Sequence, residues 1–239
     1  MRHRSPSIPT TGSASWRTRT CGPSLPHRPV PKNEEMGSCI LRSTCGIALP
    51  VDRTQEERVD TQAKIATMFN PRSVAIIGAS RTIGKWGFTF TLHLIRGGYR
   101  GTIYPINPAG GEMMGLRTYR TLDGVPGPVD LAFILLPPDK VAAAITECGA
   151  LGIPACVVIT AGFAELGGEG KALEEDITRA ARDANIAMVG PNCAGIISTH
   201  PESLYCMMQP DFPPPGHIAV VSQSGNIAGS MQFMLWKQD

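Results

Sequence analysis

The chain has 239 residues, 42% of them hydrophobic, so it is long enough for one full domain and part of a second. The formal net charge is +2, and no run of Lys and Arg is long enough to follow a phosphate backbone, so we do not expect a nucleic-acid partner. No apolar stretch approaches the roughly 18 to 20 residues that span a bilayer, and the seven cysteines include no Cys-x-x-Cys pair. We therefore expect a soluble, cytoplasmic protein with no membrane segment and no metal site.

The first sixty residues are rich in Pro, Ser, Thr and Arg and show no hydrophobic period that would build a helix or a strand. We predict a disordered tail over residues 1–60. Its Arg-rich, acid-poor start resembles an organellar transit peptide in composition, but prolines between Pro6 and Pro31 would break the amphipathic helix that such a signal needs. A start codon assigned too early is our preferred explanation, with Met36 as one candidate start.

From Ser73 onward, short β-branched runs alternate with helical stretches, which is typical of a parallel sheet covered on both faces. Helices are expected between the strands, among them Asp139–Leu151, with Asp139 as its N-cap, and Lys171–Ala184. Parallel strands joined by crossover connections of about ten or more residues predict a Rossmann-like, doubly wound α/β domain over residues 61–209. The predicted strands are Ser73–Gly78, Thr102–Asn107, Asp130–Leu136, Ala155–Thr160 and Ile186–Gly190.

A Pro-rich segment at residues 210–216 predicts a stiff linker and a domain boundary. After it, His217–Ser222 is predicted as a strand, Gln223–Gly225 as a tight turn and Asn226–Trp236 as a helix. One strand and one helix cannot bury their apolar faces alone, so residues 217–239 are expected to begin a truncated second α/β domain. The exposed apolar helix favours self-association into a homo-oligomer.

In open parallel sheets, ligands bind beyond the carboxyl ends of the strands. The loop after the first strand, Gly78–Gly87, has small residues that let backbone amides approach an anion at the start of the next helix. Its glycines lack the Gly-x-Gly-x-x-Gly spacing, and Pro105–Pro108 contains no acidic residue to hold an adenosine ribose, so NAD is disfavoured. The alternative is a glycine-rich turn that serves only close helix packing.

Short loops also follow the other strands, and Asn192 offers both a donor and an acceptor, while Lys85 offers a mobile positive charge. Prolines in these loops could simply end the strands, but such loops recur at successive strand ends. The residues predicted to hold the ligand are Gly78, Ala79, Ser80, Arg81, Gly84, Lys85, Asn107, Pro108, Leu136, Pro137, Pro138, Ala161, Gly162 and Asn192, with Ser222, Ser224 and Gly225 at the last turn.

Six segments occur in one order along the chain: Phe69–Ser80, Tyr104–Pro108, Val129–Ala132, Ala161–Phe163, Gly190–Gly195 and Ser222–Gly225. As a set they resemble the NDP-forming acetyl-CoA and acyl-CoA synthetases, which are related to the succinyl-CoA synthetase α subunit. The resemblance extends from about residue 65 to the end of the chain.

This resemblance implies that coenzyme A binds as a substrate, with its phosphates at Ser80–Lys85, its adenine near Leu136–Pro138 and its thiol directed towards Asn192 and Cys193. Ala109 stands where the family often has a lysine, so Arg81 and Lys85 are expected to supply the charge. Packing in a tight turn is the favoured role for Cys193, because the family's chemistry uses the thiol of CoA.

The resemblance also implies a reaction in which an acid, CoA and ATP give acyl-CoA, ADP and phosphate through a phosphorylated histidine of the second, flavodoxin-like domain. ATP and Mg would be bound by an ATP-grasp domain or subunit, and Ser222–Gly225 resembles the helix start that stabilises the phosphohistidine. No histidine of this chain is assigned a catalytic role.

Three hypotheses follow. The chain is the N-terminal part of an ADP-forming acyl-CoA synthetase, inactive alone; or it is a stand-alone CoA-binding or nucleotide-sensing module; or, least favoured, it is an NAD-dependent oxidoreductase.

Overall fold

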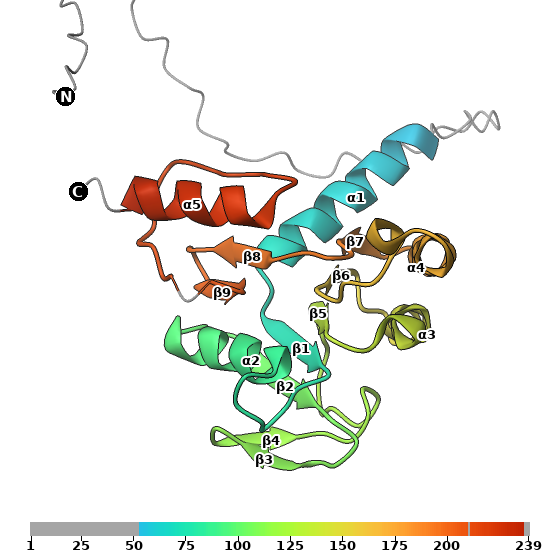
Figure 1. Ribbon diagram of the computed structural model, residues 1–239, viewed down its shortest axis with the longest axis horizontal. Coiled ribbons are helices and arrows are strands. Elements are labelled where there is room, and N and C mark those ends of the chain that lie inside the picture. Colours follow the sequence, from blue (N-terminus) through green and yellow to red (C-terminus); the bar gives the residue numbers. More distant parts are fainter. Residues whose placement is uncertain (1–52, 210, 237–239) are drawn as a thin grey trace, which may run out of the picture. The chain divides into compact units, whose positions relative to one another are not determined.

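The computed structural model describes residues 53–209 and 211–236. Its centre is a five-stranded parallel sheet in the order β2-β1-β5-β6-β7 (Figure 1), which confirms the Rossmann-like α/β prediction. The backbone of β1 pairs on both sides, with β2 and with β5, so β1 is a central strand. The strands are β1 (Ser73–Ile77), β2 (Thr102–Ile106), β5 (Leu131–Ile134), β6 (Ala155–Val158) and β7 (Ala187–Val189).

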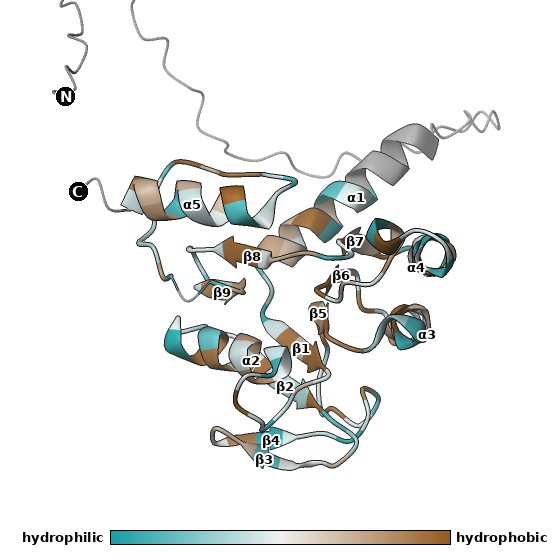
Figure 2. Cartoon of the chain, in the orientation of Figure 1, coloured by the Kyte–Doolittle hydropathy of each residue, from teal (hydrophilic) through white to brown (hydrophobic). Residues whose placement is uncertain are grey.

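Helices cover both faces of the sheet because successive side chains of a strand point to opposite sides. Val74 and Ile76 of β1 share a core with Phe90 of α2 (Trp86–Arg96). Ala75 and Ile77 belong to the other core, which is covered by α3 (Pro138–Ala150) and α4 (Glu169–Asp183). Figure 2 shows the hydrophobic strands lying between helices whose outer surfaces are hydrophilic. The near-continuous hydrophobic strands are thus explained by burial on both faces.

Helix α1 (Arg53–Phe69) corrects the prediction of a disordered tail over residues 1–60. The helix includes residues 53–60, and Met68 near its end is buried in the core beneath α2. Asp60 pairs with Lys64 one turn later, and Asn185 donates a hydrogen bond of 3.2 Å to the same carboxylate. Tertiary packing therefore stabilises a helix that local composition does not indicate. Residues 1–52, including Met36, lie outside the described residues.

Two antiparallel hairpins were not predicted. The first joins β3 (Gly111–Met113) to β4 (Leu116–Thr118) between β2 and β5. The second joins β8 (Gly195–Ser198) to β9 (Leu204–Met207) after the sheet. β9 is buried against α2, where His93 Nδ1 lies 2.7 Å from the Met207 carbonyl oxygen. Short strands of three or four residues carry too little periodic pattern to be recognised from sequence.

Every predicted strand extends past its observed end, by one residue at Gly78 and Gly190 and by two at Leu136. Gly78 and Gly190 have φ angles of +96° and +104°, which turn the chain out of the sheet. The prediction of Asp139 as an N-cap is wrong, because α3 begins at Pro138 and Pro137 is its N-cap. Pro138 has a φ angle that already suits a helix, so the helix starts there. The N-cap is therefore Pro137, two residues before Asp139.

The predicted strand at His217–Ser222 does not form. A strand needs a hydrogen-bonding neighbour, and the described residues place no other strand beside this segment. The helix after it does form, as α5 (Gly225–Trp236), beside the second hairpin (Figure 1). Within residues 53–209 and 211–236, no helix is both long and apolar enough to cross a membrane.

Candidate functional site

The loop after β1 joins the sheet to α2 through two glycines. A Cβ on Gly87 would lie 2.1 Å from the Gly78 carbonyl oxygen, and one on Gly78 would lie 2.6 Å from the Leu135 carbonyl oxygen. Both positions therefore exclude any side chain. Gly84 differs, because a Cβ added to it would meet no atom within 4 Å. Its φ of +87° nevertheless favours glycine. Close helix packing, the alternative weighed from the sequence, thus explains Gly78 and Gly87 but leaves the exposed turn around Gly84 for another role.

The start of α2 is open to solvent and lacks a side-chain cap. Lys85 occupies the N-cap position with an extended backbone, its side chain makes no capping hydrogen bond, and the first turn contains no acidic residue. The first amides of a helix have no partner within the helix, and the helix dipole adds partial positive charge. Arg81 and Lys85 are both exposed beside it, whereas Ser80 Oγ accepts a hydrogen bond of 3.1 Å from the Thr82 amide. This end of the molecule can hold an anion.

Asn107, after β2, connects two loops of the site. Its Nδ2 donates a hydrogen bond of 2.7 Å to the Ala79 carbonyl, and its Oδ1 accepts one of 2.9 Å from the Ala109 amide. The Ala79 amide, 3.1 Å from the Ile106 carbonyl oxygen, ties the same loops from the other direction. The Asn107 amide is therefore already used, and it positions the loops, while Pro108 beside it stays exposed.

Arg120 is a site residue that the sequence did not indicate. It lies two residues after the end of β4, and its Nη1 donates a hydrogen bond of 3.0 Å to the Pro108 carbonyl. A Cβ on Gly110 would lie 3.1 Å from Arg120 Cγ, and one on Gly111 would lie 3.5 Å from Arg81 Nη1. Two arginines from different loops thus lie against neighbouring glycines of one turn. The signal in the sequence was the glycine at 115 between two short apolar segments, which indicates a hairpin returning to this turn.

The loops after β5 and β6 meet at the start of α3. Thr160 Oγ1 donates a hydrogen bond of 2.6 Å to the Leu136 carbonyl, and a Cβ on Gly162 would lie 2.9 Å from Pro138 Cγ. Leu136 and Pro138 are half-buried there, and Pro137 and Ala161 are exposed. These small and cyclic side chains form an apolar border to the site.

Glu165 in the short helix η1 (Ala164–Leu166) was also missed. Its Oε1 accepts a hydrogen bond of 2.6 Å from the Gly162 amide, and its Oε2 accepts one of 3.1 Å from the Phe163 amide. The Gly162 hydrogen bond is the main reason that the pKa of this carboxyl lies below its usual value. Gly162 was predicted to be among the residues that hold the ligand, but the Glu165 carboxylate already accepts the hydrogen bond of its amide.

Asn192 follows β7 with a φ of +51°, and its backbone amide donates a hydrogen bond of 2.9 Å to the Thr160 carbonyl. Its side chain is exposed. Cys193 beside it is half-buried, and the Gly195 amide lies 3.3 Å from its Sγ. Burial raises the pKa of the Cys193 thiol, so it stays protonated at neutral pH and is a poor nucleophile.

The turn before α5 packs on the loop that follows β7. A Cβ on Gly225 would lie 2.7 Å from the Ala194 Cβ. Ser224 caps the helix, with its Oγ 3.4 Å from the Ile227 amide, and Ser222 Oγ accepts a hydrogen bond of 3.1 Å from the Ser224 amide. The structure therefore brings the last predicted segment to the loop that contains Asn192, although more than twenty-five residues separate them in sequence.

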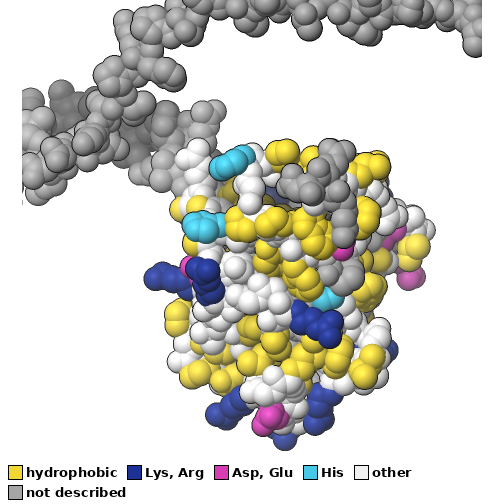
Figure 3. Space-filling view, turned by 90° about the vertical axis from the view of Figure 1, so that its left-hand side faces the viewer, with side chains coloured by type: hydrophobic (Ala, Val, Ile, Leu, Met, Phe, Trp, Pro, Cys, Tyr) yellow, Lys and Arg dark blue, Asp and Glu magenta, His cyan; other side chains and the backbone are white. Residues whose placement is uncertain are grey.

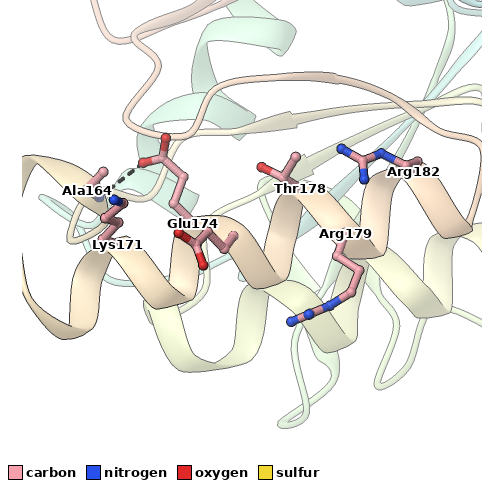
Figure 4. A pocket seen from close by; sticks show the side chains of 7 residues that line it. Ala164, Lys171, Glu174, Thr178, Arg179 and Arg182 are labelled. Atoms are coloured by element: carbon pink, nitrogen blue, oxygen red, sulfur yellow. Dashed lines mark hydrogen bonds between the residues drawn. The ribbon is translucent and has the colours of Figure 1, made fainter.

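A cavity outside these loops lies beside α4. It has a volume of about 410 Å³ and follows the outer surface of α4 (Figure 4), where Glu174 accepts a hydrogen bond from the Ala164 amide. A smaller one, of about 110 Å³, lies near the amino ends of β5 and β6 and is lined by Val129 and Ile153. Neither coincides with the loops above, and ligands of parallel sheets bind at the carboxyl edge, so we assign the site to the loops. Among the described residues no group of three potential metal ligands gathers.

Comparison with known proteins shows the family of this chain. A family model described as a CoA binding domain matches residues 72–199. The chain is 39% identical over 165 residues to the alpha subunit of ADP-forming acetate–CoA ligase I of Pyrococcus furiosus. The aligned region makes up 67% of this chain and 36% of the relative. It is 41% identical over 161 residues to the ADP-forming acetate–CoA ligase of Methanocaldococcus jannaschii. Here the aligned region makes up 67% of this chain and 22% of the relative.

Among solved structures, a dinucleotide-forming acetyl-coenzyme A synthetase of Ca. Korarchaeum cryptofilum, in complex with phosphate and ADP, superposes with a TM-score of 0.62 at 34% identity. The match covers 72% of this chain and 36% of that one. These relatives confirm the family predicted from the six sequence segments. The chain spans little more than a third of the length of the first relatives, or less.

Proposed function

We propose, because the chain belongs to the CoA-binding domain family, that residues 61–209 bind coenzyme A across the carboxyl edge of the sheet. The observation that carries this proposal is the exposed and uncapped start of α2, flanked by Arg81 and Lys85 and free of acidic residues in its first turn. Backbone amides at a helix start are a ready site for phosphate groups. The diphosphate of CoA would lie over Ser80–Lys85.

The remaining parts of CoA would follow the edge away from α2. The apolar border formed by Leu136, Pro137 and Pro138 suits the adenine ring, and the exposed amide of Asn192 suits the polar pantetheine end that bears the thiol. Gly162 and Ala161 would contact the ligand only by shape, because the carboxylate of Glu165 repels phosphate there. Asn107 acts indirectly, by holding the loops together.

The proposal extends to a reaction in which an acid, CoA and ATP give acyl-CoA, ADP and phosphate, as the names of the relatives suggest. An ATP-grasp domain or subunit would bind ATP and Mg. Within the described residues, His93 is buried under β9 and bonded to a carbonyl, so it is unsuited to carry a phosphoryl group at the edge of the sheet. We therefore expect the 239 residues to bind CoA but to catalyse no reaction alone.

A second domain beginning near residue 217 is part of the same proposal. Phe212 in the linker 210–216 packs edge-on against His93 and Tyr205, with ring centroids 5.9 and 5.5 Å apart. Beyond this anchor, Val221 is 98% exposed, and α5 presents an apolar face that contains Ile227, Met231, Phe233, Met234 and Leu235 (Figure 3). Such a face favours a contact with further protein, either the ATP-grasp part or a second copy.

A stand-alone CoA-binding module without catalysis is the second candidate. The observation that favours it is the extent of the family match, residues 72–199, which is a binding domain and no more. Addition of a separately produced protein that supplies the rest of the second domain and the ATP-grasp part, together with acid and ATP, distinguishes the two candidates. Acyl-CoA formation supports the synthetase, and CoA binding without any turnover supports the module.

Isothermal titration of the purified chain tests the proposal directly. CoA should bind with one site per chain, whereas NAD and NADP should give no binding heat. Arg179→Gln, on the outer surface of α4 beside the larger cavity, is a matched control that should bind CoA like the wild type. Binding of NAD in place of CoA would reject the proposal.

A further inference from the structure

Arg81 and Arg120 converge on one turn from two separate loops. The turn follows β2, and Gly110 and Gly111 have φ angles of +61° and +94°. With no Cβ present, the guanidinium of Arg120 lies over Gly110, and Nη1 of Arg81 approaches Gly111. The Asn107 side chain and its backbone carbonyl hold this turn closed through the Ala109 and Gly110 amides. The two cations therefore stand on a rigid base next to the loop that begins α2.

These cations are not neutralised by the protein. The ion pairs within the described part of the chain involve Lys64, Arg72 and Arg179, so neither Arg81 nor Arg120 pairs with a carboxylate there. A guanidinium has five N–H donors, and the hydrogen bond to Pro108 uses one of those on Arg120. The nearby acid, Glu112, stands opposite Arg117 in the hairpin. Figure 3 shows Lys and Arg side chains grouped at the end of the molecule where Figure 1 places β3 and β4.

The end of β2 is where Rossmann-like folds read the substituents of the ribose. An acidic residue there binds free ribose hydroxyls, and an arginine accommodates a phosphate on the ribose. In this chain two arginines that pair with no carboxylate of the described residues lie against the turn after β2, and Pro105–Gly111 contains no acid. Coenzyme A carries such a phosphate on its 3′ oxygen, and dephospho-CoA is the same molecule without it.

We infer that Arg81 and Arg120 together bind the 3′-phosphate of CoA and so make this domain select CoA over dephospho-CoA. The inference rests on the proposed function, since it assigns one group of the ligand proposed there. Arg120 can serve as both a ligand and a brace, because its hydrogen bond to Pro108 uses only one of its five N–H donors. Arg81 supplies a second charge from the α2 side.

The test compares two ligands in the full chain by isothermal titration. Wild type should bind CoA at least about tenfold more tightly than dephospho-CoA, which is the usual effect of losing one charge-assisted contact. Arg120→Gln and Arg81→Gln should each weaken CoA by about tenfold and leave dephospho-CoA unchanged. Arg117→Gln, on the same hairpin and opposite Glu112, is the matched control and should change neither affinity.

Other outcomes overturn the inference in distinguishable ways. If Arg120→Gln weakens both ligands equally, the arginine is only a structural brace, and CoA binding itself still stands. If wild type binds the two ligands equally, no subsite for the 3′-phosphate exists at this turn. If wild type binds neither ligand, the proposed function fails and this inference fails with it.

Discussion

The side chain of Asn107 donates a hydrogen bond of 2.7 Å to the carbonyl of Ala79, so the loops that follow the two neighbouring strands β1 and β2 are joined directly. The other end of the same amide accepts a hydrogen bond from the Ala109 amide. One side chain therefore sets the distance between the start of α2 and the turn on which Arg120 rests. The spacing of the two loops therefore depends on this link.

Replacement of Asn107 by Ala should destabilise the domain by about 1–2 kcal/mol, because two hydrogen bonds of a half-buried amide are lost together. CoA affinity should fall as well, since the two loops would no longer keep their spacing. Urea unfolding and titration with CoA measure the two effects. Asn226→Ala, exposed on α5, serves as the control. Unchanged stability of the Asn107 variant would show that the link is dispensable.

Gly87→Ala should be among the most damaging substitutions on this side of the sheet. The new methyl group would lie 2.1 Å from the Gly78 carbonyl oxygen, so the first turn of α2 must move away from the sheet. We expect a loss of about 2–3 kcal/mol, in the range of overpacked cores. Thermal unfolding can compare it with Gly216→Ala, where no atom lies within 4 Å. Equal melting temperatures for the two variants would be inconsistent with this packing.

Glu165 should make a small contribution to the stability of the fold that is lost at acidic pH. Its pKa is lower in the folded chain than the ordinary value of 4.5, mainly because the Gly162 amide bonds its carboxylate. A lowered pKa stabilises the fold above the ordinary value, and the contribution disappears as the pH falls through the folded value. The effect should be small, since the carboxyl is exposed and water screens it.

The comparison of Glu165→Gln with wild type measures this contribution. A neutral glutamine has one acceptor oxygen and cannot hold both the Gly162 and Phe163 amides. At pH 7 the wild type should have the higher melting temperature. The difference between the two melting temperatures should shrink as the pH falls below 4.5 and then vanish. Glu175→Gln, exposed on α4, is the control. A difference that grows on acidification would contradict the assignment.

Much of the fold was predictable because its strands are buried on both faces. Continuous runs such as Val74–Ile77 leave a clear signal, and the helical stretches between them indicate parallel pairing. The boundaries were less predictable, since residues such as Gly78 and Leu136 are hydrophobic or small whether they belong to the strand or to the loop. The unpaired segment His217–Ser222 shows the same limit, because a strand-like pattern forms a strand only beside a partner.

The site was predictable as a set of loops but not as a set of contacts. Parallel topology alone requires the loops at Gly78, Asn107 and Asn192 to share one edge. Which polar groups remain available depends on pairings that sequence does not reveal. Gly162 was expected to hold the ligand, but Glu165 accepts the hydrogen bond of its amide. Arg120 was not predicted, because a short hairpin returns it to the turn after β2.

Hydrogen–deuterium exchange of the full chain, with and without saturating CoA, shows where on the molecule the ligand binds. Amide exchange should slow in residues 79–86 and 107–111, which border the start of α2 and the arginine turn, and should be unchanged over residues 164–182, which border the larger cavity. Slower exchange confined to residues 164–182, or no change at either place, would contradict the account.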